Sequence, residues 1–367
     1  MTKFFRIILF MILCFVVGSN LILPAFAESE NLNAILCVSY RGDTAEFESN
    51  SPEAVVSAFS KGADFVSVNI RKTADGELVL CRENETEVKG VTLKDMMGQL
   101  AEDDVLILDS EPQLKDEIYE LLESEDAFSS AIIRINDSTG NILKWIDGKN
   151  ENLQVIGVYD SFVVFTAMSH IRNLGENGMQ IVQYQSKNYF NEMFGSLVSK
   201  TIKAQDKAKA LVPTYSPDLC GQRSDSEDGW NDLIKKGYSV IETNNLDAFL
   251  GYIKANESIR LELSALTEKA YAIDVDKYNT VSKENLEDAI AVAQGLLNGG
   301  AASSDELQSS ASKLILAMDN LALKSADDTQ KGALNITAGK VIAAVLVGAV
   351  ILAAQIYTYK MQKGKKK

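Results

Sequence analysis

The side chains best suited to chemistry stand where short apolar runs end. Arg41 follows the run that ends at Tyr40, and Arg82 follows the run that ends at Cys81. A guanidinium binds phosphate or carboxylate in a planar, bidentate way, so both arginines are candidates for holding an anionic ligand. Four acidic residues lie nearby in the sequence: Asp43, Glu46, Glu48 and Glu83. A solvated surface explains them better than calcium binding or general acid catalysis does.

The chain has a single histidine, His170. Imidazole, with an ordinary pKa of ~6.5, both takes and gives a proton near neutral pH, which is why hydrolases often use it. A mechanism that needs two histidines is therefore excluded. His170 itself lies in SFVVFTAMSHIRNLG, a predicted helix in which we expect a surface or packing role.

The elements that would position these residues alternate along residues 33–254. Eight apolar runs are predicted strands: Ala34–Ser39, Phe65–Ile70, Val105–Leu108, Ala131–Ile135, Gln154–Tyr159, Gln180–Gln183, Ala210–Tyr215 and Tyr238–Ile241. Helical patterns lie between them, among them Pro52–Lys61, Gln113–Ser124, Phe162–Leu174 and Trp230–Lys236. Strands that are apolar on both faces favour a parallel sheet covered by helices, and eight of them suit a (β/α)8 barrel. An open doubly wound sheet is the alternative. Glu77–Leu80, after the turn Asp75-Gly76, predicts an extra short strand.

Residues 257–323 change to a composition rich in Ala, Leu, Glu and Lys, with helical spacing. Three helices are predicted from their apolar positions: Leu261, Leu263 and Leu266; Leu286, Ile290, Ala293 and Leu297; Leu307, Leu314, Met318 and Leu321. Ser303-Ser304-Asp305-Glu306 is a capping box at the start of the third helix. This part of the chain resembles the three-helix FIVAR module of bacterial surface proteins.

The two ends predict export and anchoring. Residues 1–27 have a basic start, an apolar run and a final Ala-Phe-Ala, the pattern of a secretory signal peptide, with a retained anchor as the alternative. Residues 338–358 form an apolar run long enough to span a bilayer, and the lysine-rich tail 359–367 after it predicts a cytoplasmic C-terminus. A polar tether, residues 324–337, precedes the span. We therefore expect a single-pass protein of the cell membrane with its domains outside.

The net charge limits the kinds of partner that are expected, and the cysteine content limits the expected disulfides and metal sites. The net charge of −15 argues against nucleic acid as a partner. Outside the predicted signal peptide, the cysteines are Cys37, Cys81 and Cys220. They are far apart and odd in number, so neither a disulfide framework nor a zinc site is predicted, although one bridge remains open.

The stretch from Tyr40 to Asn84 resembles the glycerophosphodiester phosphodiesterase family. The family's pattern of H-R-G, P-E-N-T, A-F, G-A-D-x-x-E-x-D-V, T-x-D-G and V-x-x-H-D is matched at Arg41-Gly42, Pro52-Glu53, Ala58-Phe59, Gly62-Ala63-Asp64, Thr73, Asp75-Gly76 and Val79. GYSVIETNN, residues 237–245, is similar to the family's closing G-x-D-G-I-I-T-D strand. The resemblance covers residues 33–254 and implies a (β/α)8 barrel and metal-dependent hydrolysis of glycerophosphodiesters.

The departures from the family pattern fall on its working positions. Tyr40 and Arg82 stand where the resemblance implies the two catalytic histidines. The resemblance implies metal-binding carboxylates at three other positions, which are Ser67, Asn69 and Asp109 in this chain. Only Asp109 is a carboxylate. Glu111 takes the place of a phosphate-binding lysine, where it would either repel an anion or pair with an arginine. A hard divalent cation prefers several carboxylate oxygens, so weak or absent binding of calcium or magnesium is expected.

These residues predict a barrel that binds rather than hydrolyses. The ligand candidates are a phosphorylated small molecule held by Arg41 and Arg82, with Glu111 nearby, or a cell-surface glycan. The alternative is an active phosphoric diester hydrolase that uses a divalent cation and unfamiliar residues, with Asp109 or Glu83 as the base.

Overall fold

The computed structural model of this chain describes residues 35–81, 87–160, 173, 181–185, 209–214, 225–299 and 301–324. They belong to two compact units: one takes the described residues up to Glu262 together with Gly295–Gln308, and the other takes Leu263–Gln294 and those from Ser309 on. The predicted signal peptide, transmembrane segment and basic tail lie outside the described residues, as does the tether after Lys324. No described helix is long and apolar enough to cross a membrane.

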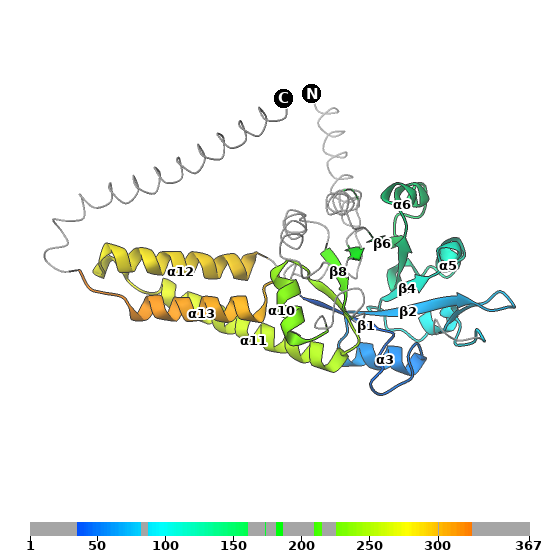
Figure 1. The fold of residues 1–367 in the computed structure, drawn as a ribbon, viewed down its shortest axis with the longest axis horizontal. Coiled ribbons are helices and arrows are strands. Elements are labelled where there is room, and N and C mark those ends of the chain that lie inside the picture. Colours follow the sequence, from blue (N-terminus) through cyan, green and yellow to red (C-terminus); the bar gives the residue numbers. More distant parts are fainter. Residues whose placement is uncertain are drawn as a thin grey trace, which may run out of the picture. The chain divides into compact units, whose positions relative to one another are not determined.

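In the first unit, the described strands include eight parallel ones that close into a barrel (Figure 1). In order around the barrel they are β1 (Leu36–Tyr40), β2 (Phe65–Lys72), β4 (Leu106–Ser110), β5 (Ala131–Asn136), β6 (Gln154–Asp160), β7 (Ile181–Gln185), β8 (Lys209–Pro213) and β9 (Val240–Thr243). β1 pairs in parallel with both β2 and β9, which closes the sheet. The closure confirms the barrel and rules out the open doubly wound sheet. The predicted extra strand is β3 (Leu78–Leu80), antiparallel to β2.

Helices follow the strands as a (β/α)8 barrel requires. They are α3 (Pro52–Lys61) after β1, α4 (Leu93–Met97) after β3, η1 (Pro112–Leu114) and α5 (Lys115–Ser124) after β4, α6 (Thr139–Ile146) after β5, α10 (Glu227–Lys235) after β8 and α11 (Leu246–Tyr271) after β9. A short 3-10 turn, η2 (Phe128–Ser130), leads into β5. Apart from Asn173, the predicted helix Phe162–Leu174 lies outside the described residues, and so does His170.

Local sequence signals place α3 at its predicted residues. The Ser51 side chain accepts a hydrogen bond from the Ala54 amide at 3.1 Å, and Pro52 occupies the first helical position, where its missing N–H costs nothing. Gly62 ends the helix with a φ of 108°, a left-handed conformation that glycine adopts freely. These signals are local, which is why the sequence alone predicts both ends of the helix.

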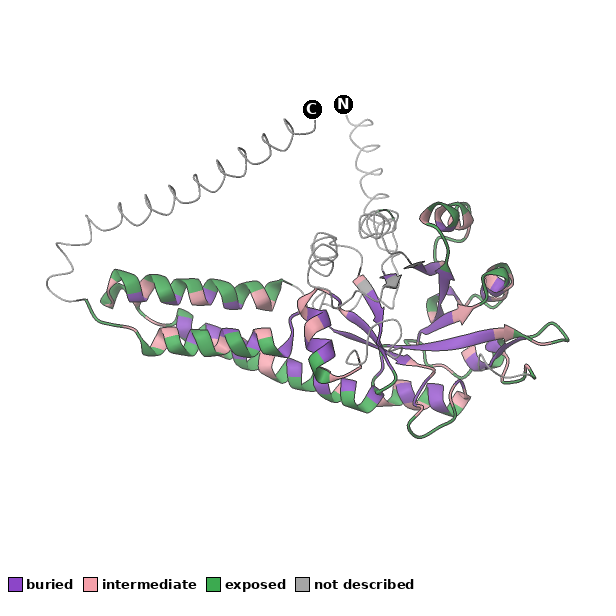
Figure 2. Ribbon diagram, in the orientation of Figure 1, coloured by how far each residue is buried: buried purple, intermediate pink, exposed green. Residues whose placement is uncertain are grey.

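The barrel strands are buried along most of their length (Figure 2). Two apolar cores pack against their two faces. One core lies between the outside of the sheet and the helices and includes Ile118, Leu122, Trp230 and Phe249. The other fills the barrel interior and consists of Leu36, Val38, Phe65, Val105, Ile107, Ile132, Ile156, Val158, Ile181, Leu211 and Val240. Because neighbouring side chains alternate between the two faces of a strand, the second set shows which positions face inward. Cys37 and Cys81 are buried and are not joined by a disulfide, and Cys220 lies outside the described residues.

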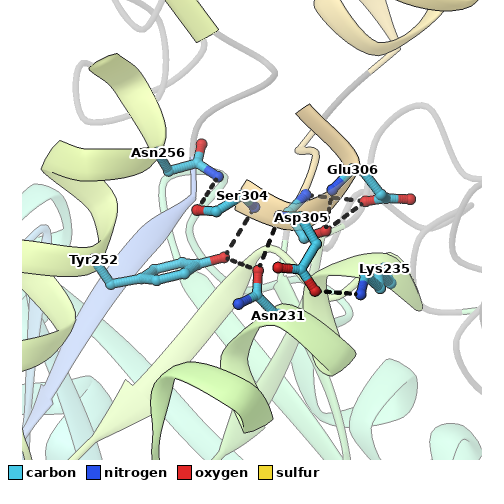
Figure 3. A network of polar contacts seen from close by, with 8 residues as sticks. Asn231, Lys235, Tyr252, Asn256, Ser304, Asp305 and Glu306 are labelled. Carbon is cyan, nitrogen blue, oxygen red and sulfur yellow. Dashed lines mark hydrogen bonds and ion pairs between the residues drawn. The ribbon is translucent and has the colours of Figure 1, made fainter. Parts of the chain in front are cut away.

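The first unit extends beyond the predicted end of the barrel, because Gly295–Gln308 belongs to it. Its contacts with α10 and α11 form a polar network that is buried around Tyr252 and exposed at Lys235 (Figure 3). Tyr252 Oη donates to Asn231 Oδ1 at 3.0 Å and accepts from the Ser304 amide at 3.4 Å. Lys235 Nζ lies 2.7 Å from Asp305 Oδ2. The predicted boundary between residues 254 and 257 therefore differs from the structure, in which α11 runs through it without a break.

The second unit is built from parts of three helices: the end of α11, α12 (Thr280–Asn298) and α13 (Ser304–Asp319). A short 3-10 turn, η3 (Val275–Lys277), joins the first two. Leu263, Leu286, Ile290 and Leu314 are buried, as their spacing predicts. Leu261 is instead 72% exposed, because two residues turn a helix by about 200° and carry it away from the face of Leu263.

The capping box at the start of α13 is confirmed. The Ser303 amide donates to Glu306 Oε2 at 3.0 Å, and the Glu306 amide donates to Ser303 Oγ at 3.3 Å. Each side chain thus satisfies a backbone donor that has no partner within the helix.

Candidate functional site

Tyr40 and Arg41 lie at the carboxyl end of β1, where the chain turns sharply. Arg41 has a φ of 65° and Gly42 a φ of 87°. A Cβ on Gly42 would lie 2.6 Å from the carbonyl carbon of Ala54, so only glycine lets this turn approach α3. The turn places the Arg41 guanidinium carbon 4.4 Å from the centroid of the Tyr40 ring, a cation–π contact at the mouth of the barrel.

Asn69, at the implied position of a metal carboxylate, is held by hydrogen bonds. Its Oδ1 accepts from Arg41 Nε at 2.7 Å and from Asn50 Nδ2 at 3.4 Å. Its backbone N–H donates to Asn50 Oδ1 at 3.2 Å. An amide oxygen that already accepts from a guanidinium and a second amide is poorly placed to bind a cation. Asn69 therefore ties the loop after β1 to β2.

Three charged side chains from different strands meet inside the barrel. Arg134 Nη2 donates to Glu242 Oε1 at 2.9 Å, and Arg134 Nη1 donates to Asp109 Oδ2 at 3.3 Å. The side chains of Arg134 and Glu242 are 4% and 0% exposed, and that of Asp109 is 32% exposed. A buried charge is tolerated only when it is paired, so these three residues stabilise one another as a set.

This arrangement does not fit the divalent cation that the family resemblance implies. Of the three implied ligand positions, Ser67 has a hydroxyl, Asn69 has an engaged amide, and Asp109 pairs with a guanidinium. Within the described part of the chain, no group of three or more His, Cys, Asp or Glu side chains could hold a metal. Arg134 supplies beside Asp109 the positive charge that a metal would otherwise bring.

Glu111 lies outside this cluster. It precedes η1 as an exposed residue, and its carboxylate accepts a hydrogen bond from Gln113 Nε2. The sequence suggests an arginine pairing for Glu111, but in the structure Asp109 and Glu242 make the pairing with Arg134. Arg82 and Glu83 lie outside the described residues.

Asp43 is not part of a solvated surface, contrary to expectation. Its side chain is fully buried and lies 2.8 Å from Lys61 Nζ, and Ser57 Oγ donates to Asp43 Oδ2 at 2.7 Å. Burial alone would raise the pKa of the Asp43 carboxyl, but the hydrogen bonds from Lys61 and Ser57 outweigh it and hold the pKa below its ordinary value. Lys61 also contacts Glu46 and Asp247 at 3.2 and 3.1 Å, so it joins the loop after β1 to α11.

The lowered pKa of Asp43 predicts an acid-sensitive contribution to stability. A carboxyl whose pKa is lower in the folded state stabilises that state above its unfolded pKa, about 3.9, and loses this contribution as the pH falls through the folded pKa. We expect the urea midpoint of Asp43→Asn to lie below that of the wild type at pH 7 and the two to converge below about pH 4. A constant gap from pH 7 to pH 3 would contradict this origin.

Arg134 and Glu242 are not among the site residues predicted from the sequence. A signal was present, because each is a charged residue inside an otherwise apolar strand, in AIIRIN and VIET. Such a residue on a strand buried on both faces needs a partner of opposite charge. Arg134 stands at no position that the family pattern marks, whereas Glu242 takes the place of an isoleucine in the closing strand of that pattern.

No family model matches the sequence. No curated protein matches it either. Solved structures that resemble this chain include a glycerophosphodiester phosphodiesterase from Thermotoga maritima, with 14% identity over 59% of this chain and 97% of that one, at a TM-score of 0.46. Another, a glycerophosphoryl diester phosphodiesterase from Parabacteroides distasonis, has 16% identity over 58% of this chain and 83% of that one, at a TM-score of 0.47. A glycerophosphoryl diester phosphodiesterase domain from Mycobacterium tuberculosis has 16% identity over 60% and 99%, at 0.43.

Proposed function

We propose that this protein is a binding protein built on a phosphodiesterase-like barrel and that it does not hydrolyse phosphodiesters. One observation carries the proposal: the Arg134 guanidinium lies between Asp109 and Glu242 inside the barrel. Asp109 is the one carboxylate at the implied ligand positions, and its carboxylate would have to leave this guanidinium to bind a divalent cation. Without a cation, the attacking and leaving oxygens of a phosphodiester lose their electrostatic stabilisation.

The proton-transfer groups support the same proposal. Tyr40 and Arg82 replace both implied histidines, and a tyrosine or arginine with an ordinary pKa of about 10 or higher is a poor general base near neutral pH. Arg41, which could have clamped a phosphate, donates its Nε hydrogen to Asn69 and lies over the Tyr40 ring. The site is thus organised around contacts within the chain.

The decisive experiment is a metal titration combined with a hydrolysis assay on the purified full-length protein. We expect no heat of binding from calcium or magnesium and no release of glycerol 3-phosphate from glycerophosphocholine. The alternative function, an active phosphoric diester hydrolase, predicts release that a chelator stops. Hydrolysis that is present in the wild type and lost in Asp109→Ala would overturn the proposal.

The cellular setting belongs to the same proposal. A signal peptide at residues 1–27 and a membrane span at residues 338–358 would present the barrel and the helical unit outside the cell. The ligand would then be met at the cell surface, as a phosphorylated small molecule or as part of a surface glycan. The resemblance of residues 257–323 to a FIVAR module supports a surface location.

A further inference from the structure

Four inward-facing polar residues form one layer of the barrel interior. Ser67, Arg134, Gln183 and Glu242 each stand two residues after an interior apolar residue, at Phe65, Ile132, Ile181 and Val240 respectively. They come from β2, β5, β7 and β9, which are alternate strands of the barrel. Interiors of (β/α)8 barrels are filled by layers of four side chains from alternate strands, so these four residues, here called the polar layer, lie at one level along the axis.

The polar layer is buried in an otherwise apolar interior. Its members are 1%, 6%, 0% and 0% exposed in the order given above. The layer beneath it consists of Val38, Ile107, Ile156 and Leu211, all apolar. A layer of this fold normally holds bulky branched apolar residues. Polar residues in their place reduce stability unless their hydrogen-bonding groups are satisfied.

Several of these groups have no partner among the described residues. They are Ser67 Oγ, both amide atoms of Gln183 and Glu242 Oε2. A buried polar atom without a hydrogen bond destabilises the folded state, and here the unpartnered atoms belong to three residues of one layer. Their common position indicates that a hydrogen-bonding molecule satisfies them together.

The unpartnered set defines the chemistry of that molecule. Glu242 Oε2 and Gln183 Oε1 need donors, Gln183 Nε2 needs an acceptor, and Ser67 Oγ serves as either. A hydroxyl group both donates and accepts, whereas an ammonium group only donates. The layer holds one cation and one anion, Arg134 and Glu242, and Asp109 adds a carboxylate beside them. The surplus of negative charge disfavours a phosphate at this level.

We propose that the polar layer binds the hydroxyl groups of a neutral polyol, such as a sugar or glycerol unit, without a metal. This proposal rests on the proposed function, since it places a metal-free ligand at the level of Ser67, where the family resemblance implies a metal carboxylate. Glu242 Oε2 accepts from one hydroxyl, and the Gln183 amide exchanges donor and acceptor with a second. The phosphate or remaining glycan of a larger ligand would lie toward Arg41.

The test compares two buried glutamines at different levels of the barrel. Gln183→Leu removes the unpartnered amide of the polar layer, and Gln154→Leu removes the Gln154 amide, whose Nε2 is also unpartnered, at the start of β6. Binding of glycerol and glucose to the full-length protein is followed by saturation-transfer NMR in glycerol-free buffer. We expect the wild type and Gln154→Leu to bind equally and Gln183→Leu to bind about tenfold or more weakly.

Stability separates a ligand site from a structural role. Both leucine variants should unfold at urea concentrations no lower than the wild type, because each removes an unsatisfied buried group. Ser67→Ala, a smaller change, should also weaken binding. Equal binding by the wild type and Gln183→Leu, or no binding of either polyol, would overturn the inference and leave buried water as the partner of the layer. Polyol binding that requires calcium or magnesium would overturn the proposed function as well. If the protein bound neither metal nor polyol, only the inference would be overturned.

Discussion

Replacing Arg134 by methionine should lower the free energy of unfolding by about 3 to 5 kcal/mol. The side chains of Arg134 and Glu242 are almost fully buried, and their atoms lie 2.9 Å apart. Methionine fills much of the same volume but leaves the Glu242 carboxylate buried without a counter-charge. Asp109 is less affected because its side chain is 32% exposed and water can solvate it. Urea unfolding of the two proteins at pH 7 measures the difference.

A double variant tests whether the loss comes from the uncompensated charge. Arg134→Met combined with Glu242→Met removes both buried charges, so most of the lost stability should return. Lys94→Met is the matched control, since Lys94 pairs with Glu125 at 2.6 Å while its own side chain is 61% exposed. Surface pairs contribute only about 0–1 kcal/mol. If the Arg134 variant lost no more than the Lys94 variant, the ion pair would not be a central support of the barrel.

Ending the chain at residue 254, the predicted end of the barrel, should destabilise the barrel by about 2 to 5 kcal/mol relative to a chain that ends at residue 324. The shorter chain loses Gly295–Gln308, which belongs to the compact unit of the barrel. It therefore loses the hydrogen bond from the Ser304 amide to Tyr252 Oη and the packing of Ala301 against the outer core. Tyr252, 6% exposed and in contact with Trp230, would become accessible to water.

Thermal and urea unfolding of the two chains, followed by tryptophan fluorescence, measure this effect because Trp230 lies in the affected cluster. Tyr252→Phe in the full-length protein removes the hydrogen bonds of the Tyr252 hydroxyl without shortening the chain. It should lower the free energy of unfolding by about 1 to 2 kcal/mol. Tyr119→Phe is its control, since the Tyr119 hydroxyl donates to Glu123 at an exposed position. Identical stabilities of the two truncated chains would show that the barrel folds without Gly295–Gln308.

Much of the fold could be predicted because its signals are local. Strand positions agree with the predicted runs to within a few residues, because a strand buried on both faces is apolar along its whole length. The ends of α3 and the capping box of α13 follow from side chains that hydrogen-bond within three residues of themselves. The predicted end of the barrel at residue 254 differs from the structure, in which Gly295–Gln308 also belongs to the barrel unit. The contacts responsible join Asn231 and Tyr252 to residues more than fifty positions later, beyond the reach of local sequence patterns.

The sequence by itself determined which residues are available for chemistry: one histidine, no full set of metal carboxylates, and arginines after the first strands. Only the tertiary structure decided what those residues do. Arg134 meets Asp109 and Glu242 across 25 and 108 positions of the chain, because closing the barrel brings the interior faces of β4, β5 and β9 together. The polar layer likewise exists only at one strand register, since a shift by one residue would turn its side chains outward. Short-range sequence patterns indicate which side chains of one strand share a face. The register between strands and the closure of the barrel depend on all eight strands packing together.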